Sequence, residues 1–228
     1  MKSAIVFIVY NRPEYFQQVL DSVSKTLYLE KYDLFFNFDS HNKNIIKIAI
    51  KFLKNINYPL TSNTIKINDI PLGCGANHRD GIDRVFNLGY DHVVCIEDDI
   101  IIANDTLKYF YETYDLNLIT CAFSLVFDLN LQENIFKLNW FNPWAWSINK
   151  LLWNGIKEKI QWNKMWDMNI TNYIIKNNIM CLYPCSTRSE NIGKYGLNQQ
   201  NANTHNSTFT VSINGDYDKN IEYKIYIK

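Results

Sequence analysis

The sequence has 228 residues, of which 47% are hydrophobic and 15% aromatic, so the chain can bury a full core and is not a disordered tail. Its length suits one α/β domain, with room for a small appendage. The formal net charge of +0 gives no overall attraction to nucleic acid or anionic lipid, so an anionic ligand must be held by a local site. We therefore expect no nucleic-acid partner.

The five cysteines are odd in number, stand mostly in apolar runs and include no CxxC pair. This pattern fits reduced core thiols better than a disulfide or zinc framework. The apolar run at the N-terminus is interrupted at Asn11-Arg12-Pro13, too early for a membrane span, and no secretory cleavage site follows it. We predict a cytoplasmic protein without a transmembrane segment.

The first half of the chain alternates strands and helices. Strands are predicted where apolar runs are short, and helices where apolar residues recur at helical spacing or where Pro13 can open a first turn. In chain order, the segments are a strand at 4–10, a helix from 13, a strand at 32–40, a helix at 42–56, a strand at 63–69, a helix at 76–90 and a strand at 92–99. This order predicts a mostly parallel sheet covered by helices on both faces.

The second half is patterned differently. It has an apolar segment at 118–127, a tryptophan-rich segment at 139–153, a helical pattern at 165–177, a strand-like run at 179–184 and a polar stretch at 186–206. The tail at 209–228 alternates like a hairpin that turns near Asn214-Gly215. We find no internal repeat and no low-complexity linker, so a single domain over 1–228 is predicted.

Three polar features follow the predicted parallel strands: Asn11-Arg12, Asp39 and the run Glu97-Asp98-Asp99. Ligands bind beyond the carboxyl ends of such strands. Three adjacent acids repel one another and lose hydration if they are covered, so a cationic partner is expected. The alternative is a solvated turn, but the apolar residues on both sides of the run argue against it. A hard divalent ion that bridges the acids to a diphosphate suits this pattern, and Mn²⁺ and Mg²⁺ both fit.

The stretch VVCIEDDIIIANDTLKYFYETY resembles the metal-binding strand of glycosyltransferases with the GT-A fold, specifically the N-acetylglucosaminyltransferase I family. LGCGANHRDGIDRVF before it, and WDMNITNYIIKNNIMCLYPCSTRSENIG with ANTH after it, are similar to bacterial nucleotide-diphospho-sugar transferases. The resemblance runs in order from Ala4 to His205. It implies a GT-A fold, with a nucleotide-sugar-binding half at 1–114 and an acceptor-side half, including the C-terminal hairpin, at 115–228.

The resemblance also implies roles for individual residues. Asp99 would coordinate the metal, and Asp98 and Glu97 would contact the ribose, the sugar or metal-bound water. Asp39 matches the acid that accepts from uracil or ribose, with a helix N-cap as the alternative. Arg12 matches a phosphate-binding arginine, which a guanidinium fork suits, with a surface cation before Pro13 as the alternative.

Two histidines and an arginine belong to the same implied site. His78 stands where the eukaryotic relatives place a nucleotide-facing histidine, and its neighbour Arg79 could serve the same purpose; a structural histidine is the alternative. His205, in NANTHNS, matches a similar threonine-histidine pair in bacterial relatives and could complete the metal shell or contact a phosphate. Its alternative is a solvated loop residue.

The catalytic base implied by the resemblance is Asp167, in KMWDMNI. The eukaryotic family has two adjacent acids there, so if the base is the second of them, Met168 stands in its place. A helix N-cap is the other interpretation of Asp167. The tryptophans around it offer stacking faces for an acceptor sugar, although core packing is the commoner use of this residue type; they are Trp144, Trp146, Trp162 and Trp166.

The function implied is transfer of a sugar, with inversion, from a UDP-sugar to a glycan or another hydroxyl acceptor, with Mn²⁺ or Mg²⁺ as cofactor. One alternative is a sugar-1-phosphate nucleotidyltransferase, which needs a glycine-rich loop after the first strand. That position reads VYNRPEYF and holds no glycine. A catalytically inactive nucleotide- or sugar-binding protein of the same fold is the other.

Overall fold

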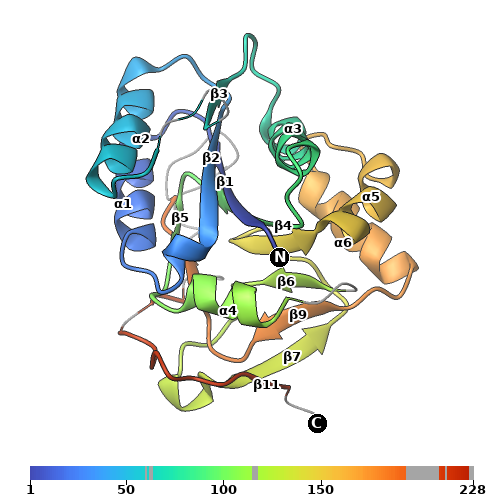
Figure 1. Cartoon of the computed structure of the whole chain (residues 1–228). Coiled ribbons are helices and arrows are strands. Elements are labelled where there is room, and N and C mark those ends of the chain that lie inside the picture. The colour runs from blue at the N-terminus through green and yellow to red at the C-terminus, as the bar shows by residue number, and fades with distance from the viewer. Residues whose placement is uncertain (60, 62–63, 115–117, 194–210, 214, 226–228) are drawn as a thin grey trace.

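The computed structural model describes residues 1–59, 61, 64–114, 118–193, 211–213 and 215–225. A large, mostly parallel sheet crosses the molecule with helices on both faces, as the sequence predicted (Figure 1). Its strands, from one edge to the other, are β11 (Lys224–Ile225), β7 (Asn134–Leu138), β9 (Cys181–Pro184), β6 (Ile119–Cys121), β8 (Trp146–Asn149), β4 (His92–Glu97), β1 (Ser3–Val9), β2 (Tyr32–Phe38) and β3 (Ile65–Ile67).

Strands β3, β2, β1 and β4 are parallel to one another, and β8 pairs antiparallel with both β4 and β6. The register pairs Val9 with Phe38 and Ile8 with Glu97. The segments that follow β1, β2 and β4 therefore emerge side by side at one edge of the sheet, where ligands bind in open α/β sheets.

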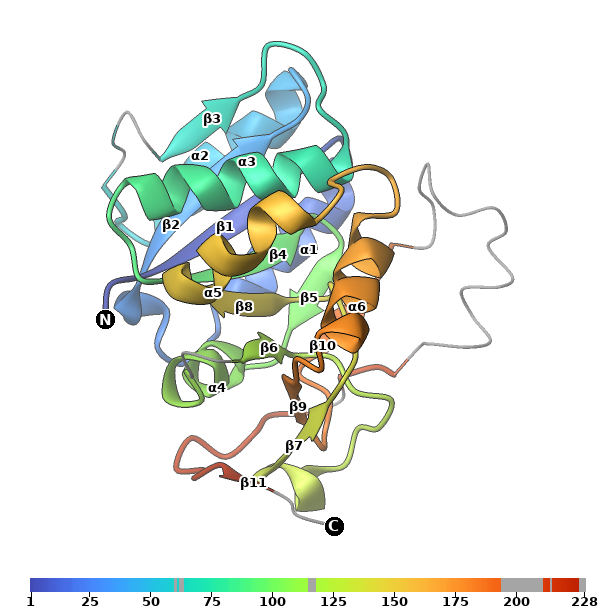
Figure 2. The ribbon, with the colours of Figure 1, turned by 90° about the vertical axis from the view of Figure 1, so that its right-hand side faces the viewer.

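The helices divide between the two faces of the sheet (Figures 1 and 2). On one face lie α1 (Pro13–Val23), α2 (Lys43–Asn55) and α4 (Thr106–Glu112), and on the other α3 (Cys74–Asn87), α5 (Lys150–Ile156) and α6 (Trp166–Lys176). Short 3₁₀ turns are η1 (Leu29–Lys31), η2 (Leu129–Leu131) and η3 (Lys157–Lys159).

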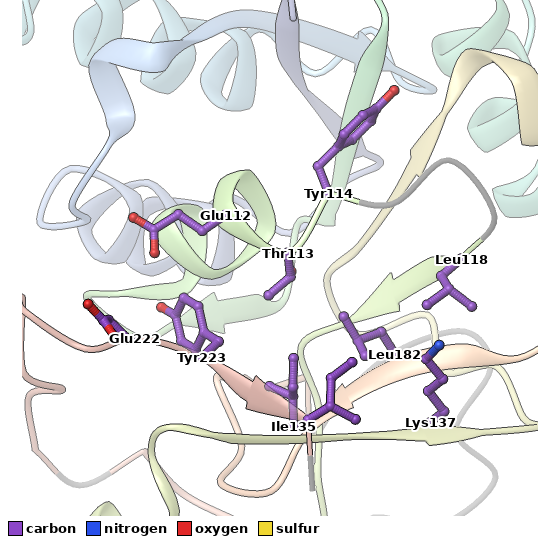
Figure 3. A pocket seen from close by; sticks show the side chains of 10 residues that line it. Glu112, Thr113, Tyr114, Leu118, Ile135, Lys137, Leu182, Glu222 and Tyr223 are labelled. Carbon is purple, nitrogen blue, oxygen red and sulfur yellow. The ribbon is translucent and has the colours of Figure 1, made fainter. Parts of the chain in front are cut away.

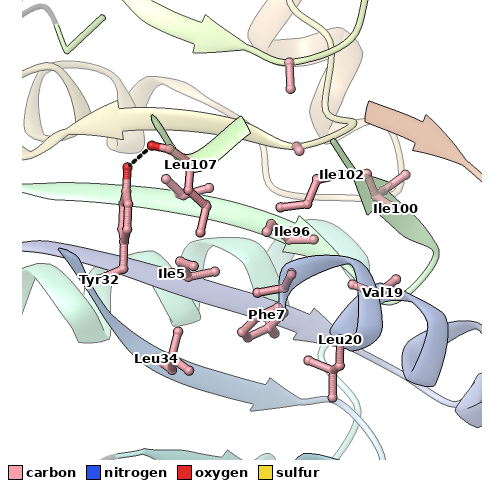
Figure 4. Packing of buried hydrophobic residues seen from close by; sticks show 14 of the residues in the cluster. Ile5, Phe7, Val19, Leu20, Tyr32, Leu34, Ile96, Ile100, Ile102 and Leu107 are labelled. Atoms are coloured by element: carbon pink, nitrogen blue, oxygen red, sulfur yellow. Dashed lines mark hydrogen bonds between the residues drawn. The ribbon is translucent and has the colours of Figure 1, made fainter. Parts of the chain in front are cut away.

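Alternation along the strands builds a core on each side of the sheet. In β1, Ile5 and Phe7 pack toward α1, whereas Ala4 and Val6 pack toward α3. Figure 4 shows the first core, in which the Tyr32 hydroxyl, at the start of β2, donates a 2.9 Å hydrogen bond to the carbonyl of Leu107 in α4.

A second, two-stranded sheet pairs β5 (Ile100–Ile102) antiparallel with β10 (Ser189–Asn191). Next to it, the fully buried Arg188 pairs with Asp105 at 2.9 Å and lies over the rings of Tyr109, Tyr217 and Tyr223. Arg188 directly precedes β10, and Ile192, which directly follows it, donates its N–H to the Asp99 carbonyl at 2.9 Å, so the segment after β10 lies against the turn between β4 and β5.

The tail differs from the predicted hairpin. Its described strand, β11, pairs in parallel with β7, whereas the two strands of a hairpin are antiparallel. Asn214, part of the predicted turn, lies outside the described residues. The hairpin prediction is wrong for this strand, because pairing with a distant strand prevailed over the local turn signal.

The cysteine prediction holds for the core: Cys95, Cys121 and Cys181 are buried, and the five cysteines are free thiols. No helix in the described part of the chain is both long and apolar enough to cross a membrane.

Candidate active site

The three adjacent acids close the central strand of the parallel region. Glu97 ends β4, and Asp98 and Asp99 form the turn into β5. Asp98 is 2% and Asp99 5% exposed, so the solvated-turn interpretation is wrong. Burial raises the pKa of both aspartates, that of Asp99 to about 6, although the positive charge of Arg12 opposes the rise.

Arg12 supplies the counter-charge. Its Nε donates to Asp98 Oδ1 at 3.1 Å, its Nη2 contacts the same oxygen, and its Nη1 donates to Asp99 Oδ2 at 2.5 Å. The second oxygen of Asp98 accepts from the backbone N–H of Tyr10 at 2.9 Å. Burial acts to lower the pKa of Arg12, but the facing carboxylates of Asp98 and Asp99 raise it overall. The surface-cation interpretation of Arg12 is therefore wrong.

One oxygen of this cluster has no partner. Asp99 Oδ1 is buried and forms no hydrogen bond with any described residue. A buried carboxylate oxygen without a partner carries a desolvation cost that a cation would remove. The donor set at this point consists of hard carboxylate oxygens, the type that Mn²⁺ and Mg²⁺ prefer, so the residues fit such an ion.

Gly193 packs directly against Asp99 and Arg12. A Cβ at this position would stand 2.1 Å from Asp99 Oδ2 and 3.1 Å from Arg12 Nη1, so only glycine fits without a shift. The neighbouring Ile192 N–H donates to the Asp99 carbonyl at 2.9 Å. Sequence reasoning did not single out Gly193, although the block NIG that contains it was part of the resemblance.

Asp39 is buried but already occupied. Its carboxylate accepts from the backbone N–H groups of Leu72 and Gly73, at 2.7 and 2.8 Å, and from the Asn68 side chain at 2.9 Å. It therefore holds the loop before α3. The helix-cap interpretation is wrong, because Asn42 caps α2.

Asn68 was missed, and the strand-end rule could have found it because it directly follows β3. It belongs to a buried amide network in which its Nδ2 also donates to Asn77 Oδ1 at 2.9 Å. Asn37 Nδ2 donates to the same oxygen at 2.7 Å and to Asp80 Oδ2 at 2.9 Å. The network joins β2, the end of β3 and α3 beside Asp39.

His78 is completely buried on α3 and lies against Trp166, with 4.1 Å between the ring centroids. Its Nδ1 donates to the Cys74 carbonyl at 3.0 Å, which leaves Nε2 as an acceptor 3.6 Å from Glu97 Oε1. Burial lowers the pKa of His78 to about 4, so the ring is neutral at physiological pH. The structure thus brings His78 to the acids.

Arg79 points elsewhere. Its Nη2 contacts Glu158 in η3, and its Nε lies 3.6 Å from Asp83 one turn along α3. The structure does not bring Arg79 together with Arg12 and the acids.

Asp167 lies in the first turn of α6, whose N-cap residue is Met165, so Asp167 is not the helix cap. A Cβ on Gly75, the second residue of α3, would stand 2.8 Å from Trp166 Cβ, which shows how closely α3 and α6 approach. Burial raises the pKa of Glu97 well above its usual value, and the charges of Asp99, Asp98 and Asp167 add to the rise while Arg12 opposes it. The charge of Asp167 in α6 therefore acts on Glu97.

The tryptophans mainly build the core. Trp146 and Trp166 are buried beside α3, and the partly buried Trp162 packs against Trp166 at 6.0 Å between ring centroids. Trp144 packs on Phe123 at 4.6 Å between ring centroids. The prediction for His205 lies outside the described residues.

A separate hollow lies away from the acids, between the end of α4 and strands β7, β9 and β11 (Figure 3). It is lined by Glu112, Tyr114, Ile135, Lys137, Leu182 and Tyr223, among others. None of these residues is a sequence-predicted site residue, so this hollow is not the site described above.

No protein-family model and no curated protein sequence matches the chain. Solved structures do. The mannosyltransferase PcManGT from Pyrobaculum calidifontis, in complex with GDP-Man and Mn²⁺, aligns with a TM-score of 0.59 at 12% identity over 80% of this chain and 54% of its own. The chain has the GT-A glycosyltransferase fold.

Two structures of S. aureus TarS agree. One aligns with a TM-score of 0.57 at 14% identity, covering 83% of this chain and 36% of TarS. The other, TarS 1-349 in complex with UDP, gives 0.58 at 13% identity, covering 82% and 59%. This chain therefore spans between about a third and three fifths of the proteins that it matches. No relative of the N-acetylglucosaminyltransferase I family stands among these three structures.

Proposed function

We propose that this chain is a glycosyltransferase that uses a divalent cation and moves a sugar from a nucleotide-sugar donor to a hydroxyl acceptor. The observation that carries the proposal is the buried Asp99 Oδ1, which has no hydrogen-bond partner among the described residues and lies beside Asp98 at the carboxyl end of the central strand of a GT-A fold. The neighbouring folds were solved with GDP-Man and Mn²⁺ in one case and with UDP in another, which supports a nucleotide-sugar donor.

Asp99 would hold the cation through its free oxygen, with Asp98 beside it. A bound divalent cation would neutralise the negative charge that develops on the diphosphate as the sugar leaves. Arg12, whose guanidinium fork suits phosphate oxygens, would bind the diphosphate. Asp39 holds the loop at Leu72 and Gly73 and so shapes the nucleoside side of the site. We propose uridine diphosphate as the nucleotide.

We propose Asp167 as the general base of an inverting transfer. Its carboxylate forms no hydrogen bond with the described residues, whereas Glu190 accepts from the Ile213 N–H at 2.9 Å and Asp128 caps η2. Of these three acids, Asp167 is therefore the one whose carboxylate has no hydrogen-bond partner among the described residues, and its charge acts on Glu97 in the cluster.

The test is release of free nucleotide from a panel of nucleotide sugars, because donor hydrolysis requires no knowledge of the acceptor. We expect hydrolysis of a UDP-sugar with Mn²⁺, none in chelator, and strong loss in Asp99→Asn. Asp69→Asn, which changes an exposed acid after β3, is the matched control. Equal donor binding with and without the cation, measured by calorimetry, would overturn the proposal.

A further inference from the structure

A second group of ligand-type side chains lies beside the acids. Cys74, His78 and Glu97 gather where the first turn of α3 meets the end of β4, and one ligand atom from each lies within 4.8 Å of the others. Cys74 and His78 are four residues apart and share one face of the helix. The three residues bring a thiol, an imidazole and a carboxylate to one point.

The histidine is held for ligation. It is completely buried and packed on Trp166, so its ring cannot turn freely. Its Nδ1–H donates to the Cys74 carbonyl, the type of backbone contact that fixes the tautomer of metal-bound histidines. Its Nε2 has no hydrogen-bond partner among the described residues and lies 3.6 Å from Glu97 Oε1, so a cation between these two atoms would be bound by both.

The donor set distinguishes this point from the neighbouring pair Asp98 and Asp99. Thiolate and imidazole ligands select Zn²⁺ and similar ions, whereas Mg²⁺ and Mn²⁺ prefer oxygen. Typical zinc–ligand bonds in a tetrahedral site separate nitrogen and oxygen ligands by about 3.4 Å. The separation of 3.6 Å between His78 and Glu97 is already close to that value.

We propose that Cys74, His78 and Glu97 form a zinc-class cation site, separate from the hard-cation site at Asp99. Three protein ligands leave one tetrahedral position for water or another ligand, as in open zinc sites. Cys74 is the outermost of the three residues, which gives the ion a path of entry, and because burial raises the pKa of its thiol, the ion has to displace the thiol proton. The proposal does not depend on the glycosyltransferase assignment, because it concerns the protein without nucleotide.

The test uses Co²⁺ as a spectroscopic stand-in for Zn²⁺, with tag-free, reduced protein and no nucleotide. We expect a thiolate-to-cobalt charge-transfer band in the near ultraviolet at one equivalent of Co²⁺. Zn²⁺ should remove the band, and excess Mg²⁺ should not. Cys74→Ser should abolish it, whereas Cys185→Ser, the control at a partly buried thiol, should keep it.

His78→Gln should lower Zn²⁺ affinity by at least about 100-fold, the upper end of the loss seen when an outer-shell partner is removed. Because His78 is buried, the folding of His78→Gln is checked by circular dichroism. If His78→Gln misfolds, the Cys74→Ser result alone decides whether the site exists. Absence of the band in the wild type, or its persistence in Cys74→Ser, overturns the proposal. Asp99→Asn should retain the band, so failure of this site and failure of the proposed transferase activity are separable.

Discussion

Arg12→Met removes the one positive charge seen to contact Asp98 and Asp99 in the described part of the chain. The side chains of Asp98 and Asp99, taken without their backbone atoms, are 2% and 7% exposed, so water replaces the guanidinium poorly. Removing one partner of a buried ion pair costs about 3–5 kcal/mol, and we take the lower end because Arg12 itself is 26% exposed. At about 2–4 °C per kcal/mol for a chain of this size, the expected fall in Tm in chelator is roughly 6–12 °C.

A divalent cation should reverse this loss. At a concentration about 100 times its Kd, an ion that binds only the folded state adds about 2.7 kcal/mol, close to the expected deficit. Wild type should gain less, because the positive charge of Arg12, which pairs with the same two carboxylates, repels the ion. The assay is thermal unfolding of both proteins with Mn²⁺ and with chelator.

Arg79→Met is the matched control, because its partner Glu158 is 67% exposed and such surface pairs contribute at most about 1 kcal/mol. If Arg12→Met melted at the wild-type temperature in chelator, Arg12 would not be the counter-charge of the acids. If Mn²⁺ stabilised the variant no more than the wild type, the acids would not be the cation site.

Three further outcomes are expected. Asp167→Asn should bind donor normally but turn over about two to four orders of magnitude more slowly, and a wild-type rate would exclude it as the base. Gly193→Ala should lower the free energy of unfolding by about 1–3 kcal/mol and weaken cation binding, because its Cβ would overlap Asp99, whereas Gly155→Ala, with open space in α5, should be neutral or stabilising. Burial lowers the pKa of His92 from 6.5 to about 3, so the unfolded state binds a proton that the folded state does not as the pH falls from 6.5 to about 3. Wild type should therefore lose stability relative to His92→Gln in this range, by about tenfold in the unfolding constant per pH unit. Parallel plots of stability against pH for the two proteins would refute this.

The first half of the fold was predictable because its elements are local and strongly patterned. A proline at the first position of α1, short apolar strands and a helical stripe in α2 each identify an element without knowledge of its neighbours. The parallel order then placed Arg12, Asp39 and the acids at one edge. In the second half, β8 lies antiparallel between β4 and β6, and β11 joins β7 from a distance. Such long-range pairings leave no periodic signal.

The partners of the site residues were less predictable than their positions. Arg12 contacts acids that are more than 80 residues away in the sequence. The carboxylate of Asp39 accepts hydrogen bonds from backbone N–H groups of the loop before α3, and no sequence motif predicts the path of that loop. Arg79 and His78 are adjacent in the sequence, yet one is exposed enough to pair with Glu158 and the other is fully buried. Adjacent helix residues point about 100° apart, so neighbours of a site residue are poor candidates for the same site.

The alternation of side chains along β4 explains why the three adjacent acids contact different groups of residues. Val93 and Cys95 belong to the core beneath α3, and Val94 and Ile96 to the core beneath α1. By the period of two, Glu97 turns toward α3, where it meets His78, Cys74 and the charge of Asp167. Asp98 and Asp99 lie beyond the strand, in the turn, and meet Arg12 from the β1 loop. The run Glu97-Asp98-Asp99 thus contributes to two different groups of residues. Glu97 joins Cys74 and His78, whereas Asp98 and Asp99 pair with Arg12.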